Sequence, residues 1–198
     1  MTSASGRRGH SKQPRKPSSN VRLMTRRTVY RGRVIQLVVE QFRAHGHRLV
    51  RETVVHPGAV VIVPLLERSR LVFVRQYRRA VQRYLLELPA GTLDPGERRE
   101  VCARRELEEE AGWRAGRLQR LCRFYPAPGF TSEELTVFIA THLTPTPARP
   151  EPDEYVTPVI LSLRTALAKI RSGQIRDAKT IIGVLLVRDL LRTRSREA

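Results

Sequence analysis

The chain has 198 residues, of which 40% are hydrophobic and 28% are charged, a composition typical of one folded domain with appendages. No apolar run reaches the roughly 18–20 residues that a membrane helix requires, so we expect no membrane partner, and we see no secretory signal at the N-terminus. The chain has 37 Lys and Arg residues and 19 Asp and Glu residues, which gives a formal net charge of +18. This charge on its own favours nucleic acid or another anionic partner.

The N-terminal part of the chain divides into a tail and a small β element. The first stretch is rich in Ser, Gly, Pro, Arg and Lys and has almost nothing to bury, which predicts a disordered basic tail over residues 1–24. From residue 25 to 57, apolar residues alternate with polar ones around a turn at 44–47. This pattern predicts a small antiparallel β element, which Pro57 and Gly58 end.

The remainder, residues 58–194, is predicted to form one domain of strands and a few helices. Apolar runs predict extended segments at 59–66, 71–77, 85–89, 118–125, 135–141 and 156–161. Capping residues, turns and glycines predict helices at 97–111, 162–171 and 177–191. This order of elements predicts an α+β fold or an α/β sandwich.

The basic and acidic residues are concentrated in different parts of the chain. Ten basic residues precede the first acidic residue, Glu40, while eight of the nineteen acids lie between Glu87 and Glu110. A run of carboxylates is usually a solvated helix face. In a basic protein, however, it also suits a bound cation.

Three of these acids share one side of the helix predicted at 97–111. Glu106, Glu109 and Glu110 fall within roughly a quarter of its circumference, where they repel one another unless a cation neutralises them. Oxygen ligands without nearby histidine or cysteine favour Mg²⁺ or Mn²⁺ over zinc. The two cysteines, Cys102 and Cys122, have neither disulfide nor metal-ligand spacing, which fits a cytoplasmic protein.

The same acids stand in a pattern that resembles the Nudix box, G-x5-E-x7-R-E-U-x-E-E-x-G-U, where U is a bulky apolar residue. Residues 91–97 and 105–113 fill every fixed position of this pattern. The last U position holds Trp113, where the family more often has an aliphatic residue. The resemblance implies the Nudix fold, an α/β/α sandwich with a mixed sheet, preceded here by the small N-terminal β element.

The resemblance also implies an activity, which is hydrolysis of a nucleoside diphosphate linked to another moiety, with Mg²⁺ or Mn²⁺ as cofactor. Carried over by position, the implied metal ligands are the carbonyl of Ala90 and the side chains of Glu97, Glu106, Glu109 and Glu110. Arg105 is implied to pair with a carboxylate of the box and to orient it.

Three further stretches are similar to the ADP-ribose pyrophosphatase subfamily. They are 75–78 followed by 87–91, the proline fifteen residues after Trp113, and 172–180. This likeness implies cleavage of ADP-ribose to AMP and ribose 5-phosphate. The residues it places on the substrate side are Arg75, Arg78, Glu87 and Pro128.

The loop after Pro128 holds the implied catalytic carboxylate. Glu133 matches the family position, and we favour it over its neighbour Glu134. Alternation should aim the two side chains in different directions. Glu133, or else Glu106, is expected to take a proton from the attacking water.

Enzymes of this kind are typically homodimers, and residues 25–57 match the element that dimerises and contributes to the partner's substrate site.

Two alternative functions remain open. The first keeps the fold and changes the substrate to another nucleoside diphosphate sugar such as GDP-mannose, because specificity depends on loops outside the motif. The second is a nucleic-acid-binding module that uses the Arg-rich tail, which predicts aromatic residues among the basic ones and a damaged box. The box is intact and no aromatic residue precedes Tyr30, although binding of nucleic acid by the tail is compatible with catalysis.

Overall fold

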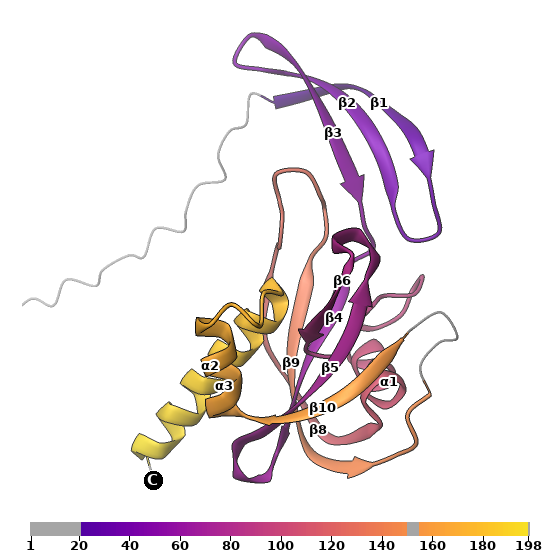
Figure 1. The fold of residues 1–198 in the computed structure, drawn as a ribbon. Coiled ribbons are helices and arrows are strands. Elements are labelled where there is room, and N and C mark those ends of the chain that lie inside the picture. The colour runs from indigo at the N-terminus through magenta and orange to yellow at the C-terminus, as the bar shows by residue number, and fades with distance from the viewer. Residues whose placement is uncertain (1–20, 150–154, 198) are drawn as a thin grey trace, which may run out of the picture.

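The computed structural model describes residues 21–149 and 155–197, so the predicted disorder of residues 1–20 lies outside the described residues. The elements are β1 (Val21–Arg31), β2 (Gln36–Ala44), β3 (His47–Val55), β4 (Ala59–Leu66), η1 (Glu67–Ser69), β5 (Arg70–Arg78), η2 (Arg79–Val81), β6 (Arg83–Glu87), β7 (Ala90–Thr92), α1 (Arg99–Ala111), β8 (Trp113–Phe124), β9 (Leu135–Pro145), β10 (Val156–Ser162), α2 (Leu163–Arg171) and α3 (Ala178–Glu197). They form a three-stranded sheet and a seven-stranded sheet (Figure 1).

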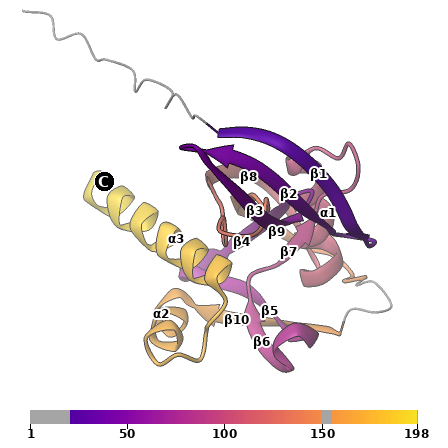
Figure 2. The same ribbon diagram turned by 90° about the horizontal axis from the view of Figure 1, so that it is seen from above.

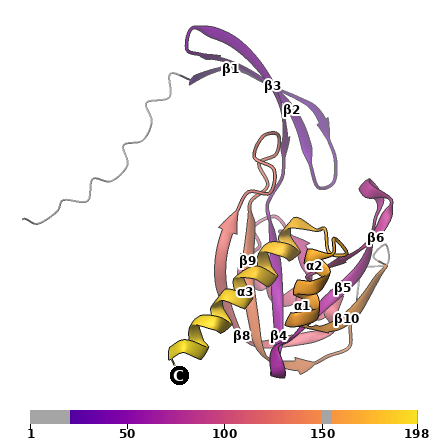
Figure 3. The ribbon, with the colours of Figure 1, turned by 60° about the vertical axis from the view of Figure 1, so that its left-hand side comes forward.

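The three-stranded sheet is antiparallel, with the order β1-β2-β3, and it stands apart from the rest of the molecule (Figures 1 and 3). β1 begins at Val21, inside the predicted tail, because Val21 pairs with Ala44 at the far end of β2. The turn between β2 and β3 contains His45 and Gly46, whose φ angles of 49° and 82° suit a tight hairpin.

The seven-stranded sheet has the order β10-β5-β4-β9-β8, with β6 beside β5 and β7 beside β4. β4 and β9 are parallel, and the other pairs are antiparallel, which confirms the predicted mixed sheet. Val60, Val61, Ile62 and Val63 of β4 are fully buried. Such a continuous apolar run is expected for a strand that is covered on both faces.

Helices cover both faces of this sheet, with α1 on one side and α2 and α3 on the other (Figure 2). Alternation along β4 divides its side chains between two cores. Val60 and Ile62 pack with Leu107 of α1, whereas Val61 and Val63 pack with Val184 of α3. The predicted α/β/α sandwich is therefore confirmed.

The helix ends follow the predicted caps, with one shift that bears on the site. α1 begins at Arg99, two residues later than predicted, because Glu97 lies in the preceding turn and its carboxylate accepts the N–H of Asp94 at 3.1 Å. Gly112 ends α1 with a φ of 69°, and Ser162 caps α2. Among the helices of residues 21–149 and 155–197, none is long and apolar enough to span a membrane.

Gly183 sets how closely α3 approaches the sheet. A Cβ atom at this position would lie 2.5 Å from Cδ1 of Leu88 and 3.1 Å from Cγ2 of Val63. Contacts this short are not tolerated in a packed core, so either α3 or the two side chains would have to move.

Gly183→Ala should therefore destabilise the protein by about 1–3 kcal/mol, although alanine is the better helix former. The free energy of unfolding from urea titration measures the effect. Gly129→Ala is the matched control, because a Cβ atom at Gly129 would meet nothing within 4 Å. Equal stability of the two variants would contradict the close approach.

Candidate active site

Arg105 lies at the centre of the acidic side of α1 and binds three carboxylates. Its Nε and Nη2 donate to the two oxygens of Glu97, each at 3.0 Å. Its Nη1 donates to Glu106 at 2.7 Å and to Glu109 at 3.1 Å. The hydrogen bonds to Glu97 raise the pKa of Arg105 and lower the pKa of Glu97. The guanidinium thus offsets the repulsion that the sequence spacing predicts.

The buried carboxylates of α1 lie against the backbone of β7. Glu110 is 2% exposed, and it accepts a hydrogen bond from the N–H of Ala90 at 3.0 Å. A Cβ atom at Gly91 would lie 1.9 Å from the carboxyl carbon of Glu106. The first glycine of the box is therefore required by the close packing of Glu106 on β7.

The donors predicted for a metal ion lie around Arg105 and β7, and three of the carboxylates accept hydrogen bonds from Arg105. Carboxylates and a backbone carbonyl are the ligands that Mg²⁺ and Mn²⁺ prefer, and the missing Cβ at Gly91 leaves room for the Glu106 carboxylate beside the Ala90 backbone. Within the described residues, no three acidic, histidine or cysteine side chains converge closely enough to hold an ion in this arrangement. The donor set fits a hard cation, which would have to share the carboxylates with Arg105.

Glu87 is buried, with 1% of its surface exposed, and joins two cations. Arg78 donates from Nε and Nη2 to its two oxygens at 2.8 Å and 2.7 Å, and Lys179 donates to Oε2. Burial alone would raise the pKa of Glu87, but the hydrogen bonds and charges of Arg78 and Lys179 outweigh it and hold the pKa below its usual value. Glu87 thereby fixes both cations in position.

The N-terminus of α3 supports the same network. Lys179 also donates to Asp177 at 2.9 Å, and the other oxygen of Asp177 accepts the N–H and the hydroxyl of Thr180 at 2.9 Å and 2.6 Å. The Thr180 hydroxyl in turn accepts the N–H of Leu88 at 2.8 Å. Asp177 therefore caps α3 as the sequence predicts, and the cap also connects α3 to the segment between β6 and β7.

A cleft made of two adjoining cavities runs between α1, β7 and the start of α3. The inner cavity has a volume of about 320 Å³, the outer one about 650 Å³, and Arg78 and the β7 backbone line both. Arg105, Glu106 and Glu109 line the outer cavity, together with Arg33 from the N-terminal sheet. The cleft is therefore lined by both cations and carboxylates.

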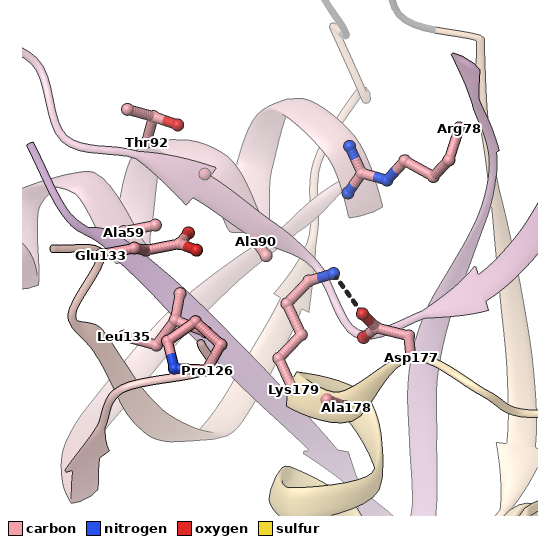
Figure 4. A pocket seen from close by; sticks show the side chains of 11 residues that line it. Ala59, Arg78, Ala90, Thr92, Pro126, Glu133, Leu135, Asp177, Ala178 and Lys179 are labelled. Atoms are coloured by element: carbon pink, nitrogen blue, oxygen red, sulfur yellow. Dashed lines mark hydrogen bonds and ion pairs between the residues drawn. The ribbon is translucent and has the colours of Figure 1, made fainter. Parts of the chain in front are cut away.

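The loop before β9 carries two adjacent glutamates with different surroundings. Glu134 accepts a hydrogen bond from Arg99 of α1 at 2.9 Å. Glu133 instead lines the inner cavity, where Figure 4 shows its carboxylate directed toward Ala90, with Lys179 on the other side of that residue. The two side chains diverge, as alternation along an extended chain predicts.

Two of the residues predicted on the substrate side lie elsewhere. Arg75 stacks over the ring of Tyr84, 4.3 Å from its centroid, and lines a separate cavity with Lys169. It stands three positions before Arg78 on one strand, so the two side chains point to opposite faces. Pro128 is exposed, and the proline that lines the inner cavity is Pro126.

Sequence patterns do not point to some residues of the cleft. Asp177 is predicted only as a helix cap, and Lys179, in the stretch 172–180, stands in no pattern that assigns it a chemical role. Arg33 lies in the turn between β1 and β2, and no motif distinguishes it from the other basic residues nearby.

Comparisons with known proteins agree with this geometry. A family model described as the NUDIX domain matches residues 55–181, a range that includes both α1 and the start of α3. The ADP-ribose pyrophosphatase of Bacillus subtilis (strain 168) is 37% identical over 159 residues, which cover 79% of this chain and 86% of that protein. The GDP-mannose pyrophosphatase of Cronobacter sakazakii is 34% identical over 134 residues, or 63% of this chain and 70% of that protein. The crystal structure of an ADP compounds hydrolase superposes with a TM-score of 0.79 at 27% identity, covering 89% of this chain and 96% of that chain.

Glu87→Gln should lower the free energy of unfolding by about 3 kcal/mol near neutral pH, because it leaves Arg78 and Lys179 without their shared carboxylate. Since the pKa of Glu87 is lower in the folded protein than its usual 4.5, its contribution is complete above that pH and is lost as the pH falls through the folded value. The difference between the variant and the parent should therefore shrink in acid. Urea titrations near pH 7 and near pH 3.5 measure it.

Glu108→Gln is the matched control, because Glu108 pairs with Arg114 at an exposed site at 2.9 Å. Its effect on stability should be much smaller. A Glu87→Gln deficit that does not change with pH would contradict the assigned ion pair.

Proposed function

Since this chain belongs to the Nudix family, we propose that its preferred substrate is ADP-ribose, which it cleaves at the pyrophosphate to give AMP and ribose 5-phosphate. The family match and the relatives make it a hydrolase of nucleoside diphosphate sugars. One observation carries the proposal for this chain: in a single cleft, Glu133 faces the cations Arg78 and Lys179 next to the acidic side of α1. This combination suits hydrolysis of a doubly negative pyrophosphate.

Mg²⁺ is the proposed cofactor, with Mn²⁺ as the alternative. A bound ion of this kind polarises the phosphoryl oxygens and lowers the pKa of a coordinated water. The residues that would hold it are the carbonyl of Ala90 and the carboxylates of Glu97, Glu106, Glu109 and Glu110. Arg105 keeps three of these carboxylates close together through its hydrogen bonds.

Glu133 is the proposed general base, which takes the proton of the attacking water at its carboxylate. A base must be within hydrogen-bonding reach of the proton that it removes, and Glu133 lines the inner cavity beside β7. Glu106 is the alternative base. Its Oε1 already accepts a hydrogen bond from Arg105 at 2.7 Å, however, so Glu133 is favoured.

Arg78 and Lys179 are the proposed partners of the substrate phosphates. Both side chains line the inner cavity, and charge-assisted hydrogen bonds to phosphate stabilise the negative charge that develops on the leaving group. Glu87 holds the two cations beneath the cleft, so they need little reorganisation when the substrate binds. Arg75 and Pro128 do not line this cleft, so the contacts proposed for them with the substrate would lie outside it.

GDP-mannose is the alternative substrate, supported by the 34% identical pyrophosphatase from Cronobacter sakazakii. Cleavage would use the same pyrophosphate chemistry, and only the contacts to the base and the sugar would differ. ADP-ribose is favoured because the relative acting on it is similar over a larger part of this chain.

A homodimer is the proposed assembly. Eight of the sixteen large hydrophobic side chains exposed in the described residues belong to the N-terminal sheet and its turn: Val21, Leu23, Met24, Val29, Tyr30, Val34, Ile35 and Val50. Exposed apolar surface of this kind marks interaction sites, and a second copy of the sheet would cover it. The contribution of Arg33 to the cleft supports a role of this sheet in the substrate site.

A cytoplasmic location is also proposed, and the two free cysteines support it.

A substrate panel with Mg²⁺ tests the proposed reaction. ADP-ribose should be cleaved with a higher kcat/KM than GDP-mannose, UDP-glucose, NADH or a dinucleoside polyphosphate, with AMP and ribose 5-phosphate as products. Glu109→Gln should reduce kcat by about 100-fold or more, because it removes a proposed metal ligand. Product formation followed by chromatography measures both results.

The matched control for this test is Glu108→Gln, which changes the neighbouring glutamate that pairs with Arg114 away from the cleft. It should retain full activity. Preferential cleavage of GDP-mannose would overturn the substrate, and an active Glu109→Gln enzyme would overturn the metal site.

Light scattering tests the proposed homodimer, which should have twice the mass of one chain. Leu23→Glu should produce a monomer, since it places a charge in the exposed apolar surface of β1. Ile160→Glu, at a similarly exposed apolar residue on β10, should remain dimeric. A parent protein that is monomeric at micromolar concentration would contradict the assembly.

A further inference from the structure

A ladder of hydrogen bonds connects the end of the N-terminal sheet to the loop that carries the proposed base. The N–H of Val54 donates to the carbonyl of Phe130 at 2.8 Å, and the N–H of Ser132 donates back to the carbonyl of Val54 at 3.0 Å. Further along, the N–H of Ala59 donates to the carbonyl of Glu134 at 3.1 Å, where the parallel pair β4–β9 begins. The loop is therefore attached to one continuous segment of chain on both sides of the base.

The ladder changes register within this stretch. Val54 forms a parallel bridge with Thr131, and Ala59 pairs with Leu135, so five steps along one segment match four steps along the other. The extra residue is accommodated near Gly58, whose φ is 97°. A break of this kind leaves backbone groups without their regular partners.

Two hydroxyl groups replace the missing partners. The Ser132 hydroxyl accepts the N–H of His56 at 3.0 Å, which joins the loop to the residue just after β3. The Thr131 hydroxyl accepts the N–H of Glu133 itself at 3.2 Å. The base therefore stands at the register break, where the Thr131 side chain holds its backbone N–H and the Ser132 side chain holds the preceding residue to His56.

We propose that Thr131 and Ser132 are positioning residues, whose hydroxyls aim the carboxylate of Glu133 into the cleft. The inference rests on the proposed role of Glu133 as the base. The bond to the Glu133 N–H restricts rotation of the backbone at that residue, and this rotation sets the direction of its Cα–Cβ bond. A shift of about 1 Å in a catalytic group is enough to slow a reaction strongly.

The neighbouring residue keeps the loop attached when these hydroxyls are removed. Glu134 is held to Arg99 of α1 by an ion pair at 2.9 Å, and its carbonyl accepts the N–H of Ala59. Removing the Thr131 hydroxyl therefore leaves the loop in place but frees the backbone at Glu133, and removing the Ser132 hydroxyl frees the preceding residue from His56. The effect should fall on the rate of the chemical step and not on binding, because the cations that meet the phosphates lie on other elements.

The experiment uses the full chain with ADP-ribose and Mg²⁺. Thr131→Val and Ser132→Ala remove one hydroxyl each, while Thr131→Ser and Ser132→Thr keep it. We expect kcat to fall about tenfold in the first two variants with KM changed less than about twofold, and to be restored in the other two. Amide hydrogen exchange should become faster at residues 131–134 in the first two variants and stay unchanged in α1. Thr144→Val, at an exposed threonine of β9, is the matched control and should behave like the parent.

Two results would overturn the inference. One is a Thr131→Val or Ser132→Ala enzyme with faster exchange in the loop but the kcat of the parent. The other is a loss of kcat that Ser and Thr at these positions do not restore.

Glu133→Gln, assayed in parallel, separates this inference from the proposed function. If Glu133→Gln is inactive and the hydroxyl variants have normal kcat, the positioning role alone is wrong. If Glu133→Gln is fully active, the base is wrong, and the positioning role falls with it.

Discussion

Carboxylates can be crowded on one side of a helix only while positive charge is held among them, and in this protein Arg105 provides that charge. Its guanidinium joins Glu97, in the turn before α1, to Glu106 and Glu109 on the helix. The turn and the helix therefore form one electrostatic unit, placed against β7 by the contact between Glu106 and Gly91. A divalent cation entering this unit would have to share these carboxylates with Arg105.

Much of the fold and of the acidic site could be predicted because both depend on short-range patterns. Glutamates three and four positions apart must share a helix face, and a continuous apolar run such as 59–66 must be buried on both sides. The role of Lys179 could not be predicted in this way, because its partner Glu87 is 92 residues distant in the chain and periodicity carries no information at that separation. Arg75 is a different case, since its spacing of three from Arg78 already indicated opposite faces of a strand.

The cleft is assembled from several parts of the chain that are unlike in composition. The N-terminal sheet contributes Arg33, the acidic helix and its turn contribute the carboxylates, and the start of α3 contributes Lys179. The excess of basic residues in the whole chain thus says little about function, whereas the few partly buried cations that pair with carboxylates say a great deal. Their positions are fixed by ion pairs to buried carboxylates, which lose strength if either partner is displaced.

The contact between His56 and Ser132 joins residues that are 76 positions apart. Closing so long a loop costs conformational entropy, and contacts of this kind form late when a chain folds. The acidic helix, by contrast, is built from neighbours in sequence. During synthesis, the acidic helix and its turn are therefore complete before the loop that carries Glu133 has emerged and paired with His56.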